Sequence, residues 1–248
     1  MPAGTSGRPR FLASVTSVAE ALTAMAAGAE IIDGKNPAAG ALGALPHDTV
    51  RAIVEAIAGK VPVSATIGDL VPRPEILCPA ATAMAATGVD LVKIGFFSGG
   101  NPPASIAALG TLQLGHARLV GLLLADRDPD FNLIPAMASA GFAGVMLDTA
   151  TKDGRSLLDV MAPGDIARFV AAARSADLFV GLAGALRLQH IPAVAALSPD
   201  VMGFRGALCA GSVREGSLEE EAVRAVARDL SALARCPSAR HAILEATP

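Results

Sequence analysis

The feature of this sequence that most constrains its fold is a regular series of short apolar runs. Successive runs begin roughly 20 to 30 residues apart, about the length of one strand-plus-helix unit. Most of them are nearly continuous rather than alternating in polarity, as is typical of parallel strands that are covered on both faces. We therefore predict eight buried strands, at residues 11–15, 30–35, 61–66, 90–95, 119–125, 144–148, 178–183 and 201–205.

Alanine-rich stretches with helical periodicity lie between these runs. Regular alternation of strand and helix over 248 residues predicts a single α/β domain, a closed (β/α)8 barrel of the TIM type over 1–248, with 1–9 as a flexible tail. An open, doubly wound parallel sheet is the alternative. Asp48 precedes one periodic stretch, and we expect its side chain to cap that helix. The predicted helices include 17–27, 48–58, 80–87 and 164–175.

The composition argues against several classes of partner. The formal net charge is −3 and the chain has no Trp or Tyr, so the basic surface and the stacking rings of nucleic-acid binders are missing. No apolar run reaches the roughly 18 residues of a membrane-spanning helix, and no secretory signal is apparent at the start of the chain. Three cysteines at unrelated spacings fit free thiols. We expect a cytoplasmic protein that binds neither nucleic acid nor membranes.

Lysine is scarce in this chain, and its positions are informative. Of the 20 basic residues only four are lysine, and Lys35, Lys93 and Lys152 stand at or just beyond the C-terminal end of a predicted strand. In a (β/α)8 barrel that end of the strands carries the active site. A lysine amine there can attack a carbonyl or take up a proton, which an arginine, always protonated, cannot do. The pattern predicts a site for an anionic carbonyl compound.

Two aspartates accompany these lysines. Asp33 lies two positions before Lys35, so both side chains point to the same side of the strand. If that side is the barrel interior, we expect Asp33 and Lys35 to form a buried pair. Asp148 ends the sixth predicted strand, close in sequence to Lys152. The alternative for each pair is a structural salt bridge at the barrel mouth.

Glycines gather at the last two predicted strands, where barrels commonly bind phosphate. Gly181, Gly184 and Gly206 can expose backbone N–H groups there, and Arg205 adds a positive charge. We predict that these four residues bind phosphate. Tight turns that need glycine only for their backbone angles are the alternative.

The sequence carries no signal for a metal or a cofactor. The histidines lack metal-ligand spacing, and no dinucleotide fingerprint, P-loop or nucleophile elbow occurs. We therefore expect neither metal nor cofactor. Ser64 and Thr66 end the third predicted strand, where their hydroxyls either line the site or mark an ordinary strand exit.

In seven motifs, spread over roughly residues 11–220, the chain resembles the (5-formylfuran-3-yl)methyl phosphate synthases. The motif at 146–154 is long and specific. The motifs are IIDGKNP (31–37), GALGA (40–44), VSATIGD (63–69), VKIG (92–95), MLDTATKDG (146–154), GLAG (181–184) and GFRGA (203–207).

This resemblance implies a (β/α)8 barrel that condenses two molecules of glyceraldehyde 3-phosphate, with loss of water and one phosphate, to a furan aldehyde phosphate. The product feeds the furan core of methanofuran-type one-carbon carriers. The resemblance also implies that Lys35 forms a Schiff base and that Lys93 accepts a proton, with Lys152, Asp33 and Asp148 in support. The partner is then a small phosphorylated aldehyde, and we expect a homo-oligomer.

The sequence departs from the family at a few positions. Gly34 stands where valine is usual and Ala41 where serine is usual. An apolar LLL at 122–124 replaces a more polar exit from the fifth strand, so no substrate contact is carried over near Asp126.

Two other classes of function remain open at this point. One is another barrel enzyme, either an aldolase-like enzyme or a phosphosugar isomerase or decarboxylase that uses an Asp-x-Lys pair. The decarboxylase would need a further acidic residue shortly after this pair, where Ala38 and Ala39 stand. The other is a barrel that binds a phosphorylated metabolite without catalysis. Borohydride separates these classes, because it labels only a protein that forms an imine with its substrate.

Overall fold

A closed barrel of eight parallel strands is present in the computed structural model, which describes residues 8–151 and 153–233. Each strand pairs with the next, and β1 pairs with β8, so the predicted (β/α)8 barrel is confirmed and the open sheet is wrong. The strands are β1 (Arg10–Val15), β2 (Ile31–Gly34), β3 (Val63–Thr66), β4 (Leu91–Gly95), β5 (Arg118–Leu124), β6 (Gly144–Asp148), β7 (Phe179–Leu182) and β8 (Val201–Phe204).

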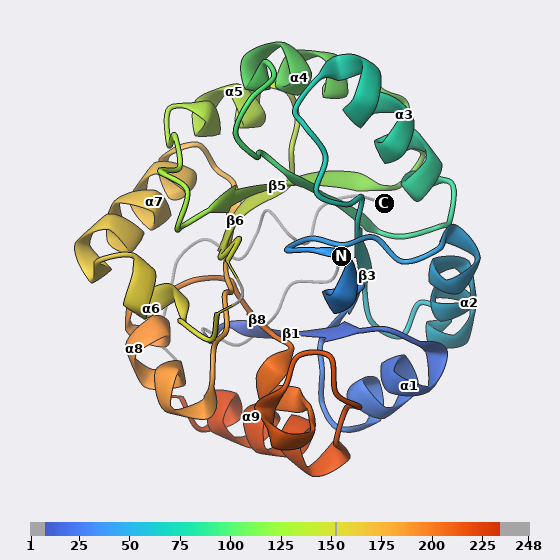
Figure 1. Ribbon diagram of the computed structural model, residues 1–248, viewed down its shortest axis with the longest axis vertical. Coiled ribbons are helices and arrows are strands. Elements are labelled where there is room, and N and C mark those ends of the chain that lie inside the picture. The colour runs from blue at the N-terminus through green and yellow to red at the C-terminus, as the bar shows by residue number, and fades with distance from the viewer. Residues whose placement is uncertain (1–7, 152, 234–248) are drawn as a thin grey trace.

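Helices surround the barrel, and α9 lies between α8 and α1 beside the β1–β8 pair (Figure 1). The α-helices in the described part of the chain are α1 (Val18–Ala26), α2 (His47–Ile57), α3 (Pro74–Ala85), α4 (Pro102–Leu109), α5 (Leu133–Ser139), α6 (Leu157–Val160), α7 (Pro163–Ser175), α8 (Ile191–Ala196) and α9 (Glu220–Ala232). Short 3-10 turns are η1 (Pro37–Ala39), η2 (Leu188–His190), η3 (Gly206–Leu208) and η4 (Ala210–Ser212).

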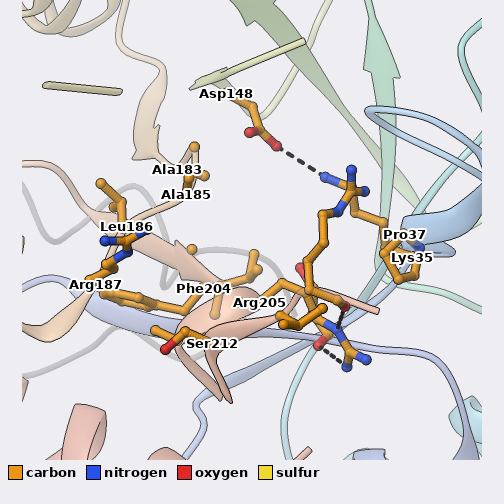
Figure 2. A pocket seen from close by; sticks show the side chains of 18 of the residues that line it. Lys35, Pro37, Asp148, Ala183, Ala185, Leu186, Arg187, Phe204, Arg205 and Ser212 are labelled. Atoms are coloured by element: carbon orange, nitrogen blue, oxygen red, sulfur yellow. Dashed lines mark hydrogen bonds and ion pairs between the residues drawn. The ribbon is translucent and has the colours of Figure 1, made fainter. Parts of the chain in front are cut away.

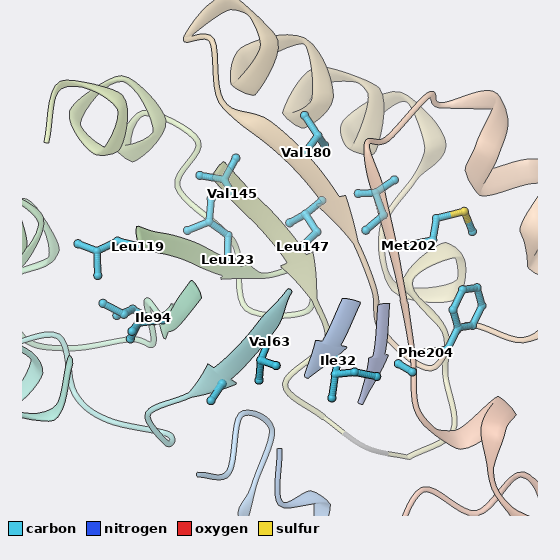
Figure 3. Close-up of a cluster of buried hydrophobic side chains, with 14 of the residues drawn as sticks. Ile32, Val63, Ile94, Leu119, Leu123, Val145, Leu147, Val180, Met202 and Phe204 are labelled. Carbon is cyan, nitrogen blue, oxygen red and sulfur yellow. The ribbon is translucent and has the colours of Figure 1, made fainter. Parts of the chain in front are cut away.

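Alternation along each strand divides the apolar residues into two cores. On β6, Val145 and Leu147 face the helices, while Met146 faces the barrel interior. Figure 3 shows the outer core between strands and helices, where Ile32 and Val180 also lie. Burying each such side chain stabilises the fold by about 1.5–3 kcal/mol. The near-continuous apolar runs therefore arise because both faces of every strand are covered.

All eight predicted strands are confirmed, and their ends move by no more than two residues. β6 is found where it was predicted, at 144–148. β2 ends at Gly34 rather than at residue 35, so Lys35 is the first residue of the following loop. This loop position lets the lysine side chain extend over the barrel mouth.

Two helix predictions are corrected. α3 begins at Pro74 rather than at residue 80 and contains Pro79, so an internal proline did not interrupt the helix. Asp48 does not cap α2: the capping position is Pro46, and Asp48 in the first turn instead accepts a hydrogen bond from Arg51 (2.7 Å). Proline at the cap offers no side-chain acceptor, and the exposed carboxylate pairs with its neighbour one turn on.

Of the predicted tail, residues 1–7 lie outside the described residues, and Arg8 forms an ion pair with Glu30 (2.8 Å). In the described ranges, no helix is both long and apolar enough to cross a membrane.

Candidate active site

A buried ion pair joins β2 and β4 inside the barrel. Lys93 Nζ lies 2.8 Å from Asp33 Oδ2, and the two side chains are 4% and 0% exposed. Asp33 also accepts hydrogen bonds from the hydroxyls of Ser14 on β1 (2.9 Å) and Ser64 on β3 (2.6 Å). Side chains from three other strands, β1, β3 and β4, thus hold this carboxylate in one position.

Burial and nearby charge act in opposite directions on Asp33. Burial raises the pKa of the carboxyl, but the charges of Lys93 and Lys35, with hydrogen bonds from Lys93 and Ser64, outweigh it, and the pKa of Asp33 lies below its ordinary value. Asp33 is therefore a fixed negative charge at neutral pH, placed directly beside the amine of Lys93.

Lys35 pairs with Asp148 rather than with Asp33, so the predicted Asp33–Lys35 pair is wrong. Lys35 Nζ lies 3.0 Å from Asp148 Oδ2, and Figure 2 shows the two side chains reaching toward each other from the start of the loop after β2 and from the end of β6. Lys35 stands one residue beyond the end of β2, nearer the barrel mouth than Asp33. The lysine from beyond the end of β2 therefore pairs across the mouth, and Asp33 pairs lower down with Lys93.

The loop after β6 is held by Asp126, which follows β5. Its carboxylate accepts hydrogen bonds from the backbone N–H of Ala150 (2.6 Å) and Thr151 (2.7 Å). Burial raises the pKa of Asp126, but these hydrogen bonds lower it further than burial raises it. Lys152, the next residue of this loop, lies outside the described residues.

A cavity of about 380 Å³ opens at the C-terminal ends of the strands. Its lining includes Lys35, Lys93, Asp148 and Ser14, together with residues of the loops after β7 and β8. The lysine-bearing ends of β2 and β4 thus meet one open cavity, as the positions of the lysines in the sequence predicted.

The predicted phosphate-binding glycines divide into two groups. Gly184 and Gly206 line the cavity, and Gly184 has φ +111, in the region that favours glycine. Gly181 instead lies within β7, where a side chain would collide with Met146, and it is not part of the cavity wall. Its lack of a side chain makes room in the barrel interior.

The two hydroxyl residues of β3 also differ in position. Ser64 donates to Asp33 beneath the cavity, as described above. Thr66 donates to the backbone carbonyl of Gly43 (3.0 Å) and is fully buried away from the cavity. Thr66 therefore supports the loop after β2, in which Lys35 is the first residue.

Arg205 follows β8 and lines the cavity, but its guanidinium is fully engaged. Its five N–H groups meet five acceptors: both carboxylate oxygens of Glu20 and the backbone carbonyls of Ser14, Arg214 and Gly216. An arginine has five N–H donors in all. The fork of Arg205 is therefore committed to the protein itself.

Three residues that sequence reasoning missed also face the cavity: Ser14, Arg187 and Arg214. Ser14 had a usable signal, because alternation in β1 places it on the same face as Leu12. Arg187 and Arg214 lie in loops, where periodicity carries no information about direction.

The loop after β2 is anchored to the inner core of the barrel. Leu42 from this loop belongs to the same buried cluster as Leu122, and Phe97 packs against that cluster. Asp69 fixes the loop by accepting hydrogen bonds from the backbone N–H of Ala41 (2.7 Å) and Leu42 (2.6 Å). The start of the same loop also borders the open cavity, which Lys35 and Pro37 line.

Among the described residues, no group of three or more His, Cys, Asp or Glu side chains is arranged to hold a metal ion.

The sequence matches the model of the family described as 4-HFC-P synthase over residues 11–227. A Methylorubrum extorquens protein, provisionally named a (5-formylfuran-3-yl)methyl phosphate synthase, is 46% identical over 87% of this chain and 89% of its own length. Proteins with the same name from Archaeoglobus fulgidus and Methanopyrus kandleri are 37% and 35% identical, over 86% and 90% of this chain and 96% and 100% of their own lengths.

Solved structures resemble this chain in fold. Phosphoribosyl anthranilate isomerase from Thermus thermophilus superimposes with a TM-score of 0.62 at 19% identity, covering 90% of this chain and 98% of that one. Thiamine phosphate pyrophosphorylase from Pyrococcus furiosus gives 0.60 at 9% identity, with 91% and 96% covered. At such identities the likeness concerns the barrel alone.

Proposed function

This chain belongs to the 4-HFC-P synthase family, and from that premise we propose that it converts two molecules of glyceraldehyde 3-phosphate into (5-formylfuran-3-yl)methyl phosphate. By reaction class this makes it a carbon–oxygen lyase, and its product would serve the furan core of methanofuran-type carriers. One observation carries the proposal. A lysine amine, Lys35 Nζ, lies 3.0 Å from Asp148 in a cavity that also contains a second buried lysine, Lys93.

Lys35 is the nucleophile in this proposal. Its unprotonated amine adds to the aldehyde carbon of the first substrate, and loss of water leaves a carbon–nitrogen double bond, the Schiff base. Asp148 is in hydrogen-bond contact with Nζ and can take the proton that the ammonium group must lose. The same carboxyl can return that proton to the departing hydroxyl.

Lys93 acts on the carbon next to the imine. The protonated imine withdraws electrons from this carbon, so a base that removes its proton leaves an enamine, which attacks the aldehyde of the second substrate. In its neutral form Lys93 is that base, and its amine is positioned by Asp33 (2.8 Å) at the base of the same cavity. Lys152 is proposed to support the imine from the loop after β6.

The substrate's phosphate is proposed to bind toward the loops after β7 and β8, where Gly184 and Gly206 line the cavity wall. The cavity, about 380 Å³, lies in the range of small-ligand sites. Over the whole reaction, condensation, ring closure and elimination release two molecules of water and one of inorganic phosphate. Inorganic phosphate should therefore compete with the substrate.

The test is reduction of the enzyme with borohydride in the presence of glyceraldehyde 3-phosphate. We expect a stable adduct, located on Lys35 by peptide mass spectrometry. Lys35→Arg should abolish both the adduct and furan formation with the fold intact, because it keeps the charge and removes the nucleophile. The melting temperature of this variant must match that of the parent.

Lys60→Arg is the matched control, since Lys60 is exposed and lies just before β3, at the far end of the barrel. It should leave the adduct and turnover unchanged. An adduct that persists in a folded Lys35→Arg variant, or turnover within tenfold of the parent, would contradict the Schiff-base role of Lys35.

A further inference from the structure

The cavity has an excess of positive charge. In the part of the chain that the structure describes, five cationic side chains line the cavity against two carboxylates. Such an imbalance in a partly enclosed space attracts an anionic ligand. The cations are Lys35, Lys93, Arg187, Arg205 and Arg214, and the carboxylates are Asp148 and Glu215.

Most of these cations already have protein partners. Lys35 and Lys93 form the two ion pairs described above, and all five N–H groups of Arg205 donate hydrogen bonds to acceptors of the protein. Arg214 differs, because its guanidinium makes one hydrogen bond, to the backbone carbonyl of Gly40 (2.9 Å). No carboxylate of the described residues lies within ion-pair distance of it, so most of its N–H groups remain available.

Arg214 is also half-buried, which makes its lack of an anionic partner costly. Burial lowers the pKa of Arg214, and the more distant charges of Asp148, Glu215 and Asp69 raise it only in part. A guanidinium remains charged in proteins all the same. A partly desolvated cation without a counter-ion is unfavourable unless a ligand supplies the opposite charge. Arg187 also lines the cavity, but it is a weaker candidate for binding an anion because its side chain is exposed to water.

We propose that Arg214 binds the phosphate of the aldehyde that is joined to Lys35, and so selects phosphorylated over unphosphorylated substrates. This inference rests on the function proposed above. The planar guanidinium fork matches the oxygens of a phosphate monoester and can bind two of them at once. Arg214 lines the same cavity as Lys35, and the charge of Asp148, the partner of Lys35, acts on it.

Arg205 is then a positioning residue for Arg214. Its Nε donates to the backbone carbonyl of Arg214 (2.8 Å), and one Nη donates to that of Gly216 (2.9 Å). Glu20 on α1 holds the other side of the Arg205 guanidinium. Arg205, which the sequence analysis assigned to phosphate, therefore fixes the loop after β8, and Arg214 reaches the cavity from that loop.

The experiment compares borohydride trapping by the parent and by Arg214→Met with glyceraldehyde 3-phosphate and with glyceraldehyde. Loss of a charge-assisted hydrogen-bonding partner should raise the half-saturating concentration of the phosphorylated aldehyde about 10- to 100-fold. The half-saturating concentration of glyceraldehyde should change less than about threefold, because it has no phosphate to lose. A second arm measures the rise in melting temperature caused by inorganic phosphate, which Arg214→Met should abolish.

Each other outcome is decisive. If trapping with both aldehydes weakens equally, Arg214 only links its loop to Gly40, and the proposal is overturned. Unchanged trapping with both aldehydes overturns it as well. If the parent is trapped with neither aldehyde, the Schiff-base function fails, and the phosphate-dependent melting temperature still decides the role of Arg214.

Arg118→Met is the matched control, because Arg118 is exposed at the opposite end of the barrel, at the start of β5. It should leave trapping and the phosphate effect unchanged. If Arg214→Met does not fold, Arg214→Lys carries the same test, since it keeps the charge and loses the planar fork. We then expect a smaller loss, still confined to the phosphorylated aldehyde.

Discussion

The two lysine–aspartate pairs differ in their surroundings far more than in their distances. The deep pair, Lys93 with Asp33, spans 2.8 Å and is enclosed by strand side chains, with hydroxyls of Ser14 and Ser64 on the same carboxylate. The rim pair, Lys35 with Asp148, spans 3.0 Å at the edge of an open cavity, and its side chains are 10% and 7% exposed. Lys93 of the deep pair lines the cavity but its carboxylate partner is fully enclosed, whereas both members of the rim pair line the cavity and are open to a ligand.

The largest effect should come from breaking the deep pair. Asp33→Asn leaves the ammonium of Lys93 buried without its counter-ion and disturbs two hydroxyl hydrogen bonds. We expect a loss of about 3–5 kcal/mol in the free energy of unfolding, measured by urea denaturation. A loss below about 1 kcal/mol would show that water or a rearranged side chain replaces the carboxylate.

Breaking the rim pair should lower the free energy of unfolding less than breaking the deep pair does. It should also slow the formation of the imine. We expect Asp148→Asn to lower the free energy of unfolding by about 1–3 kcal/mol, because the amine of Lys35 can turn toward water in the cavity. The rate of imine formation should fall by about 100-fold or more, since proton transfer at Lys35 Nζ is impaired. If the two variants lose equal stability, the distinction between a deep and a rim pair is wrong.

Acid should remove the stabilisation by the deep carboxylate. The pKa of Asp33 is lower in the folded chain than in the unfolded chain, where it is about 3.9. Its contribution is therefore complete above that value and is lost as the pH falls through the folded pKa. The difference in unfolding free energy between the parent and Asp33→Asn should shrink below about pH 4. A difference that grows on acidification would contradict this prediction, because it would mean that folding raises the pKa of Asp33.

The smallest effect should come from an aspartate–arginine pair at the surface. Asp48 pairs with Arg51 at 2.7 Å, similar to the deep pair, but its side chain is 94% exposed. Asp48→Ala should change the free energy of unfolding by no more than about 0.5 kcal/mol, measured by the same urea titration. A larger loss would mean that Asp48 supports the start of α2 after all.

The fold was largely predictable from the sequence because its strands are buried on both faces. Each apolar run stands out from its surroundings, and all eight were found. Helix starts were harder, because a proline such as Pro74 can begin a helix and Pro79 can lie within the same helix. Asp48 illustrates the same limit, since which residue caps α2 depends on backbone angles that the sequence pattern does not fix.

The site was predictable in its location and less so in its contacts. Of the three lysines at strand ends, Lys35 and Lys93 line one cavity, and Lys152 lies outside the described residues. The partner of Lys93 could not be identified from the sequence, because Asp33 lies 60 positions away and is brought to it by the pairing of β2 and β4 with β3. Arg205 was assigned to phosphate because it stands beside the glycines after the last two strands. Its partner Glu20 lies 185 positions away and could not be identified from the sequence. Contacts between distant segments are the part that local patterns cannot supply.

The closing of the barrel by β1 and β8 has a consequence for the order in which the chain can acquire its structure during synthesis. β1 has an unpaired edge until residues 201–204 have left the ribosome, and Glu20 lacks its arginine until the same moment. A nascent chain can form its early strands but not the cavity wall made by β8 and the loop after it. Products that stop short of β8 keep two open sheet edges, which favour pairing with other chains and aggregation.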